Sequence, residues 1–280
     1  MLKDGLFPCR EQVDFRVGIG LATRNRARST SRPDLNNSDR FFSNHTGDVM
    51  NTIRNYMFRD ADALVRWVRL SIYAQLAISL IAVVAGYLEY GVLSGIRDGV
   101  FASQQAAIDA AEASDARQGL IGLTQIFVSV VSGFLILRWI HRANWNARAL
   151  GARNMDFTPG WSIGWYFVPF MNLWKPYMAM KEIWRASARP GGWQGQIVPN
   201  LLGLWWFFWI VSSVLGNASF RLTMRAKAVD ELIQANVVTV LSDLVTLPLC
   251  LVFLVLMIRI HRMQAAGAGA RDWDLNPLPG

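Results

Sequence analysis

Four long apolar runs constrain this chain more than any other feature of its sequence. Residues 70–88 and 119–137 each contain nineteen residues without a charge, and residues 199–220 form a third run of twenty-two. A fourth run extends from about residue 237 to residue 258 and contains one acid, Asp243. Because a helix needs about 20 mainly apolar residues to cross the hydrocarbon core, the sequence predicts an all-α membrane protein with four transmembrane helices.

A fifth apolar stretch, residues 157–174, is less regular. Its apolar residues are interrupted by Pro159, Gly160, Gly164 and Pro169, and it is rich in aromatic side chains. Trp and Tyr favour the headgroup level of a bilayer, so we interpret the stretch as an aromatic segment between the second and third spans. The sequence leaves open whether this segment lies at the interface or re-enters the membrane.

The stretch that follows, up to residue 189, has the pattern of a helix lying on a membrane surface. Its apolar side chains recur at helical spacing, whereas its charged side chains fall elsewhere. The first set contains Leu173, Tyr177, Met180 and Trp184, and the second contains Lys181, Glu182, Arg185 and Arg189. We therefore predict one interfacial segment over residues 157–189.

The positive charges predict the orientation of the spans. The two terminal tails and the loop over residues 138–190 hold 23 Lys and Arg residues, whereas the other two loops hold 5. Since loops rich in Lys and Arg face the cytoplasm, we expect both termini and the interfacial segment on the cytoplasmic side of the membrane. The acids between the first two spans lie in an Ala-rich stretch that we expect to form a short polar helix.

The composition of the terminal segments predicts that they are disordered. Residues 1–57 are rich in Arg, Ser and Asn, and residues 265–280 lack apolar periodicity, so we predict two disordered tails around a membrane domain over residues 58–264. Met50 and Met57 are alternative first residues.

The basic charges lie beside membrane spans, which argues against nucleic-acid binding. Cys9 and Cys250 are far apart in this topology, so we expect no disulfide, metal site or cofactor.

Several sequence segments resemble one known family. The segment FTPGWSIGWYFVPFMNLWKPYMAMKEIWRAS (residues 157–187) is similar to the hallmark of a bacterial membrane family called domain of unknown function 4328, and Trp174-Lys175-Pro176 is its most specific part. The segments RWIHRANWNARALGA, LLGLWW, SDL and IHRMQ resemble the same family, so the similarity covers roughly residues 58–264. The resemblance implies a multi-pass protein of a bacterial inner (cell) membrane and brings no established activity.

Two groups of residues are candidates for ligand binding. Lys175 either extends to the headgroups or forms a phosphate-recognising pocket with Trp174, Tyr177 and Arg185. The second and fourth spans end alike, with His141-Arg142 and His261-Arg262. These pairs either anchor the helices or form one basic site for an anionic lipid headgroup.

Polar residues inside the spans are a further set of candidates. Asp243 is the one acid within a predicted span, and an ionisable group in a membrane is a candidate functional residue. It either lies shallow and reaches water, caps a helix with Ser242, pairs with Asn217, or carries a proton or cation. Pro248 in the same span predicts a kink without a break.

The pattern G-x-S-x-G occurs once, around Ser162. A serine nucleophile of this kind needs a strand-to-helix turn and a histidine base. Its aromatic, proline-rich surroundings offer neither, so we name no catalytic residue.

Three hypotheses for function follow. The first is a non-enzymatic scaffold, sensor, or lipid- or partner-binding protein; the second is a small transporter or channel that uses Asp243; the third is an intramembrane serine hydrolase that uses Ser162. The small-residue pairs Ala82–Gly86, Ser129–Gly133 and Ser212–Gly216 favour close helix packing, either within one bundle or between copies or membrane partners.

Overall fold

The described part of the chain is entirely helical. The computed structural model describes residues 56–275, with side chains as far as residue 270. The long helices are α2 (Asp62–Arg97), α3 (Gln104–Ala149), α6 (Asn200–Arg225) and α7 (Val229–Leu275). Shorter elements lie between α3 and α6, namely α4 (Trp161–Gly164), η1 (Trp165–Phe167), η2 (Met171–Leu173), α5 (Lys175–Ala188) and η3 (Pro190–Gly195).

The four long helices are each long and apolar enough to cross a membrane, which confirms the predicted four-span architecture. Each exceeds its apolar run, because backbone hydrogen bonding continues into the polar flanks. The Ala-rich stretch before the second span is therefore not a separate polar helix but the beginning of α3, capped by Ser103, whose Oγ accepts from the Ala106 amide at 3.2 Å. Likewise, α7 remains helical through Pro248.

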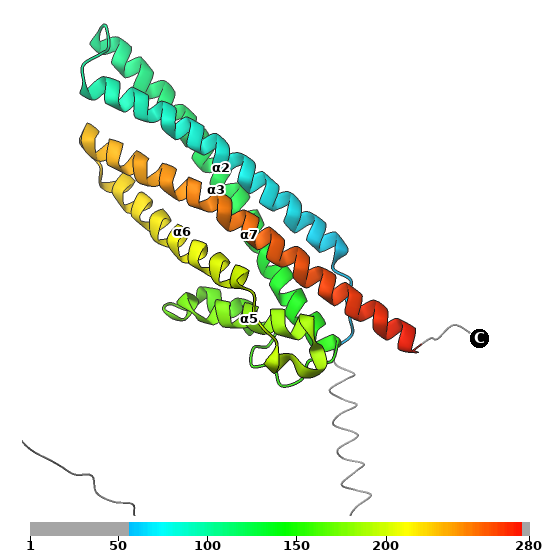
Figure 1. Ribbon diagram of the computed structural model, residues 1–280. Coiled ribbons are helices and arrows are strands. Elements are labelled where there is room, and N and C mark those ends of the chain that lie inside the picture. The colour runs from blue at the N-terminus through cyan, green and yellow to red at the C-terminus, as the bar shows by residue number, and fades with distance from the viewer. Residues whose placement is uncertain (1–55, 276–280) are drawn as a thin grey trace, which may run out of the picture. The chain divides into compact units, whose positions relative to one another are not determined.

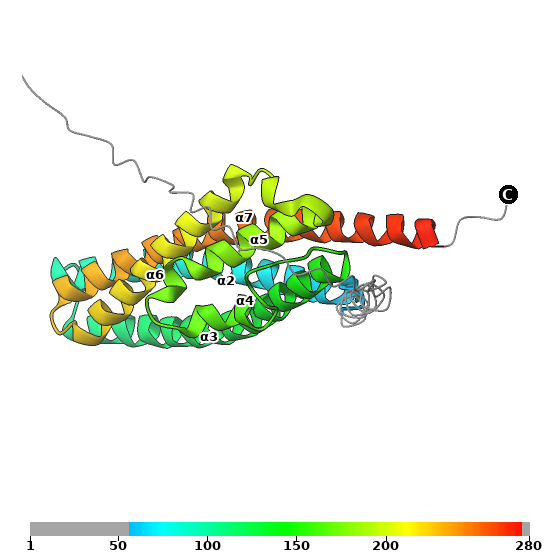
Figure 2. The ribbon, with the colours of Figure 1, turned by 90° about the horizontal axis from the view of Figure 1, so that it is seen from below.

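The long helices form an up-and-down arrangement. Figure 1 shows the α2–α3 and α6–α7 connections at one end, and the start of α2 and the end of α7 at the other. Helix α2 packs along α3 and along α7, and α7 also packs along α6. The short elements gather beside the half of the bundle where α2 begins, with α5 against α7, α3 and α6, and α7 extends past them (Figure 2). We call this end of the bundle the α5 end.

Apolar side chains cover the outside of the helices as well as their interior. Leu120, Leu123 and Phe127 of α3 and Phe207 of α6 are exposed, each with more than half of its surface accessible. Such a surface suits a hydrocarbon environment rather than water. The main core lies toward the α5 end and includes Trp139, Met180, Leu256 and Ile260.

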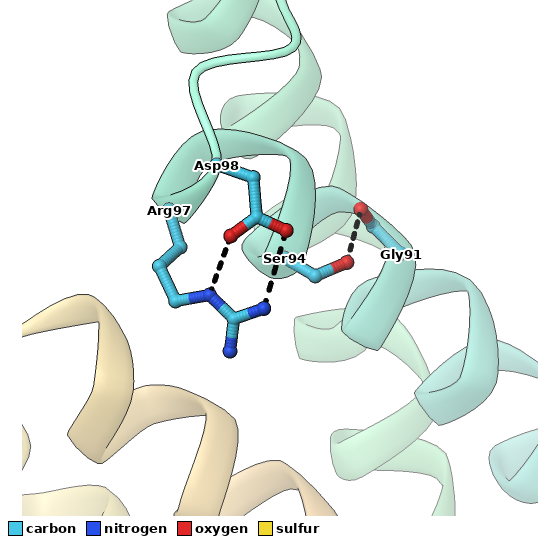
Figure 3. A network of polar contacts seen from close by, with 4 residues as sticks. All are labelled: Gly91, Ser94, Arg97 and Asp98. Atoms are coloured by element: carbon cyan, nitrogen blue, oxygen red, sulfur yellow. Dashed lines mark hydrogen bonds and ion pairs between the residues drawn. The ribbon is translucent and has the colours of Figure 1, made fainter.

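The end opposite α5 contains its own ion pair. Arg97, the last residue of α2, donates from Nε and Nη2 to the two carboxylate oxygens of Asp98 at 2.8 and 3.2 Å (Figure 3). Ser94 Oγ donates to the Gly91 carbonyl one turn earlier. Gly99 follows with φ +67°, a left-handed conformation that starts the turn to α3.

The predicted domain limits need correction at both ends. Residues 265–275 belong to α7, so the prediction of a disordered C-terminal tail from residue 265 is wrong for this stretch. At the other end, Tyr56 packs edge-on against Trp145, with ring centroids 4.6 Å apart, and the Met57 carbonyl accepts from Trp145 Nε1. The membrane domain thus includes Tyr56 and Met57, and the rest of the predicted N-terminal tail lies outside the described residues.

Candidate functional site

A buried polar cluster attaches the aromatic segment to the bundle. Asn144 Nδ2 and Arg148 Nη2 on α3 both donate to the Phe157 carbonyl at 2.9 Å. From α5, Glu182 accepts from the Asp156 amide and, at 3.1 Å, from the Phe157 amide. We call Asn144, Arg148, Asp156, Phe157 and Glu182 the Phe157 clamp. In this clamp, α3 binds the Phe157 carbonyl and α5 binds the Asp156 and Phe157 amides, so the segment is held between the two helices.

Burial controls the electrostatics of Glu182, whose surface is only 5% exposed. Desolvation raises the pKa of its carboxyl above the ordinary value, while the two backbone hydrogen bonds from Asp156 and Phe157 lower it. The charge of Asp156 adds to the increase and that of Arg148 opposes it. The clamp therefore contains a carboxyl that binds a proton more readily than a free glutamate.

The prediction that Glu182 lies on an exposed polar side of α5 is wrong, because the side chain is buried. Ala179, Met180 and Ile183 are fully buried, and α5 packs against α3 and α7. Helical spacing identifies an apolar face but cannot say whether lipid or protein covers it. The buried position of Glu182 depends on a partner 25 residues away, which local spacing does not reveal.

Lys175 does not share a pocket with the residues grouped around it in sequence. Its Nζ lies over the rings of Phe157 and Trp165, at 5.7 and 5.6 Å from their centroids. Tyr177 instead packs near Trp206, and Trp174 is exposed.

Arg185 lies ten residues after Lys175 on the same helix, which is about 15 Å along the axis. The proposed pocket of Trp174, Lys175, Tyr177 and Arg185 is therefore not formed. What the structure provides is a lysine held by two aromatic rings.

The paired basic helix ends meet the start of α2 instead of forming one free site. Arg142 Nη1 donates to the Asp60 carbonyl at 3.2 Å, and His261 Nε2 lies 2.9 Å from Asp62 Oδ1. Both contacts attach the first turn of α2 to α3 and α7. His141 is half-buried beside Arg142, and Arg262 is exposed.

Ser162 is fully buried and its Oγ donates to the Pro159 carbonyl at 2.6 Å. The hydroxyl belongs to a tight helical turn, Trp161–Gly164, with no preceding strand in the described chain. This geometry matches a turn-stabilising serine and differs from the exposed nucleophile that the motif requires.

Asp243 pairs with α3 and not with α6. Its Oδ1 accepts from Gln125 Nε2 at 2.8 Å. Asn217 Nδ2 donates to the Ser213 carbonyl of its own helix, so the suggested Asp243–Asn217 pairing is wrong. Sequence spacing could not select Gln125, because the choice depends on how α7 is rotated against α3.

A polar pocket lies at the α5 end, where the loop after α3 meets η3. It has a volume of about 400 Å³ and is lined by Gly151, Arg153, Asn154, Pro190, Gly191, Trp193 and Gln194. Asn154 has φ +55°, and Trp193 Nε1 donates to the Arg153 carbonyl at 2.8 Å. Sequence reasoning missed this pocket. The Gly and Pro residues before and after α5 are the sequence feature that could have indicated it.

Charge is distributed unequally between the two ends of the bundle. Among residues 56–270, thirteen Lys and Arg residues lie toward the α5 end against four acids, whereas the opposite end has five against seven. The α5-end cations are Arg59, Arg66, Arg69, Arg138, Arg142, Arg148, Arg153, Lys175, Lys181, Arg185, Arg189, Arg259 and Arg262. Within the described residues, His261–Asp62 is the one ion pair at this end. Most of these cations therefore have no carboxylate partner there.

No group of three or more His, Cys, Asp or Glu side chains in the described residues could hold a metal ion. No curated protein and no solved structure matches it. A model of a family described as a domain of unknown function, DUF4328, matches residues 103–262. This match spans more than half of the chain and includes the Phe157 clamp, the polar pocket and three of the four candidate spans. The chain therefore belongs to the DUF4328 family.

Proposed function

We propose that this protein is a non-enzymatic membrane protein that binds anionic lipid headgroups at its α5 end. The observation that carries the proposal is the excess of Lys and Arg over acids at that end, described above. Arg153, Arg189, Arg259 and Arg262 are exposed there. Each Lys or Arg close to an anionic membrane surface adds about 1 kcal/mol of attraction.

Exposed aromatic side chains support an interfacial position for the segment between α3 and α5. Trp161, Phe167 and Phe170 are largely accessible, and Phe170 has a φ of +62°, which is costly for a bulky residue. The chain thus directs a large aromatic ring outward at a conformational cost. Insertion of these rings at the headgroup level would place Lys175 and Arg153 beside lipid phosphates.

The same charge distribution orients the protein. The α5 end faces the cytoplasm under the positive-inside rule, because it has thirteen of the described Lys and Arg residues against five at the opposite end. With four spans, both termini are then on the cytoplasmic side. The anionic lipids of the cytoplasmic leaflet are then the partners within reach.

Lipid retention tests the proposal. Native mass spectrometry of the purified protein, exchanged into mixtures of phosphatidylglycerol and phosphatidylcholine, should show preferential retention of phosphatidylglycerol. Arg153→Ala/Arg189→Ala removes two exposed cations near the polar pocket and should weaken this retention roughly tenfold to thirtyfold. Arg221→Ala/Arg225→Ala removes two cations from the opposite end and should leave it unchanged. Equal retention in both double variants would contradict the proposed site.

Cysteine labelling tests the orientation. In a chain with Cys9→Ser and Cys250→Ala, a membrane-impermeant maleimide applied to intact cells should label Gln105→Cys and should not label Ala188→Cys. Both positions are exposed in the structure, whereas the neighbouring Ser187 is buried and would be protected on either side. The reverse labelling pattern would overturn the orientation.

A further inference from the structure

Polar side chains line the interface between α2, α3 and α7 well away from the α5 end. On α3, Ser132 Oγ donates to the Ser71 carbonyl at 3.3 Å, and Ser129 Oγ donates to Gln75 Oε1 at 3.2 Å. One turn further along, Gln125 donates to Asp243 of α7 at 2.8 Å. Near the opposite end, Asn236 Nδ2 of α7 donates to Glu89 Oε2 of α2 at 2.7 Å. Each of these bonds joins two different spans.

The contacts extend across the depth of a membrane. Ser71 and Glu89 are eighteen residues apart on one continuous helix, which is about 27 Å along its axis. The hydrocarbon core is about 30 Å thick. Because α7 runs antiparallel to α2, the separation of seven positions between Asn236 and Asp243 places Asp243 about 10 Å inward from Glu89. The four bonds are therefore spread over most of the membrane depth, with Asp243 at an intermediate level.

Ser79 is an independent sign that this interface handles a polar species. Its side chain is fully buried, and its Oγ has no hydrogen-bond partner among the described residues. Ser79 lies one turn from Gln75 and two turns from Gly86, whose Cα faces Val240 of α7. A buried hydroxyl without a partner costs about 1–3 kcal/mol, so a polar species beside Ser79 Oγ would be stabilised there.

The surroundings of Asp243 make its carboxyl a proton carrier. Helix α3 presents the neutral Gln125 to it, and on α6 Asn217 donates to its own helix. On α2 the nearest ionisable group in the line is Glu89, which Asn236 of α7 contacts. The charges of Asp115 and Arg117 of α3 act on the Glu89 carboxyl, and Arg117 lies eight residues, about 12 Å along α3, from Gln125. No cation in the described chain pairs with Asp243. A half-buried carboxylate in an apolar medium with one neutral donor is best compensated by a proton.

We propose that this polar line conducts protons across the membrane, with Asp243 as the carboxyl that accepts and releases each one. A proton enters beside Glu89 and protonates the Asp243 carboxylate. It then leaves past Ser79 and the Gln75–Ser129 pair toward the α5 end, which restores the carboxylate. One proton enters and one leaves per cycle. This activity uses none of the cations proposed to bind lipid.

Purified protein in liposomes tests the proposal. Vesicles loaded with K⁺ and treated with valinomycin develop an interior-negative potential, and a pH-sensitive acridine dye then reports proton uptake. The wild-type protein should quench the dye above the level of protein-free vesicles, and Asp243→Glu should retain the quench. Asp243→Asn should abolish it, because the amide cannot exchange a proton, while its oxygen can still accept from Gln125. Asn217→Ala, outside the line, should behave as wild type.

The outcomes separate a failed fold from a failed proposal. Monodisperse elution and unchanged tryptophan fluorescence identify folded variants, and only these are compared. Ser79→Ala should slow the quench, since it removes the hydroxyl between Asp243 and Gln75. No quench by wild-type protein, or equal quenching by wild type and a folded Asp243→Asn variant, would overturn proton conduction. An unchanged rate in Ser79→Ala would overturn the route.

Discussion

We expect Glu182→Ala to lower the free energy of unfolding by about 2–4 kcal/mol, the largest effect of any single substitution proposed for this chain. The alanine leaves the Asp156 and Phe157 amides without their acceptor in a buried site. It also removes the carboxyl group that interacts with the charge of Arg148, so this charge is less well compensated in the buried cluster. Thermal unfolding in detergent, followed by circular dichroism and by elution after heating, measures the loss.

Glu231 provides a matched control for this substitution. Its carboxylate also accepts from two backbone amides, those of Lys227 and Ala228, but it is exposed. Water replaces those bonds when the side chain is removed, so Glu231→Ala should leave the unfolding temperature nearly unchanged. Equal losses in the two alanine variants would show that burial of the Phe157 clamp does not contribute.

The raised pKa of Glu182 gives the clamp a pH dependence of defined sign. The folded protein holds the Glu182 proton more tightly than the unfolded chain, whose carboxyl has a pKa near the ordinary 4.5. The stability from this proton is complete below the unfolded pKa and is lost as the pH rises through the folded pKa. Glu182→Gln cannot titrate, so the wild-type-minus-variant difference in unfolding temperature should fall with increasing pH over this window. A difference that is constant with pH would contradict the raised pKa.

We expect Gly86→Ala to destabilise the protein by about 1–3 kcal/mol through overpacking. A Cβ atom at this position would lie 2.4 Å from Val240 Cγ2, so α2 and α7 must separate or Val240 must move. Valine is stiff about its first side-chain torsion, which makes the second option costly. Unfolding temperature in detergent measures the effect.

Gly133→Ala is the control, because nothing lies within 4 Å of a Cβ atom at Gly133. That substitution should be neutral or slightly stabilising, since alanine favours a helix more than glycine does. Val240→Ala should restore most of the stability lost in Gly86→Ala, as expected for two residues in direct contact. If the double variant is no more stable than Gly86→Ala, the close approach of α2 and α7 is not the cause.

The two glycines illustrate how far local spacing predicts packing. Ala82–Gly86 and Ser129–Gly133 have the same small-residue spacing, but only Gly86 meets a neighbouring helix at close range. This spacing indicates that another helix could pack closely against the face that carries the small residues. Which helix actually approaches depends on the rotation and crossing of both partners, which no single helix encodes.

The candidate site shows the same division. Lys175 and Asp243 were identified from their residue type and position, but their partners, Phe157 and Trp165 for the first and Gln125 for the second, come from other elements. Glu182 was assigned to a polar surface because charged residues in short amphipathic helices usually face water. Two backbone amides from another segment made its burial possible.

The membrane class, the number of spans, the uneven charge distribution and the family resemblance follow from the amino-acid sequence alone. All four depend on composition summed over about 20 residues or on contiguous motifs, and they hold however the helices pack. The burial of α5 and the polar groups along the α2–α3–α7 interface become visible in the folded chain and not before. The same holds for the contacts by which the paired basic helix ends hold the start of α2. Each of these depends on contacts between residues far apart in the chain, where a rotation of one helix by a fraction of a turn exchanges one set of partners for another.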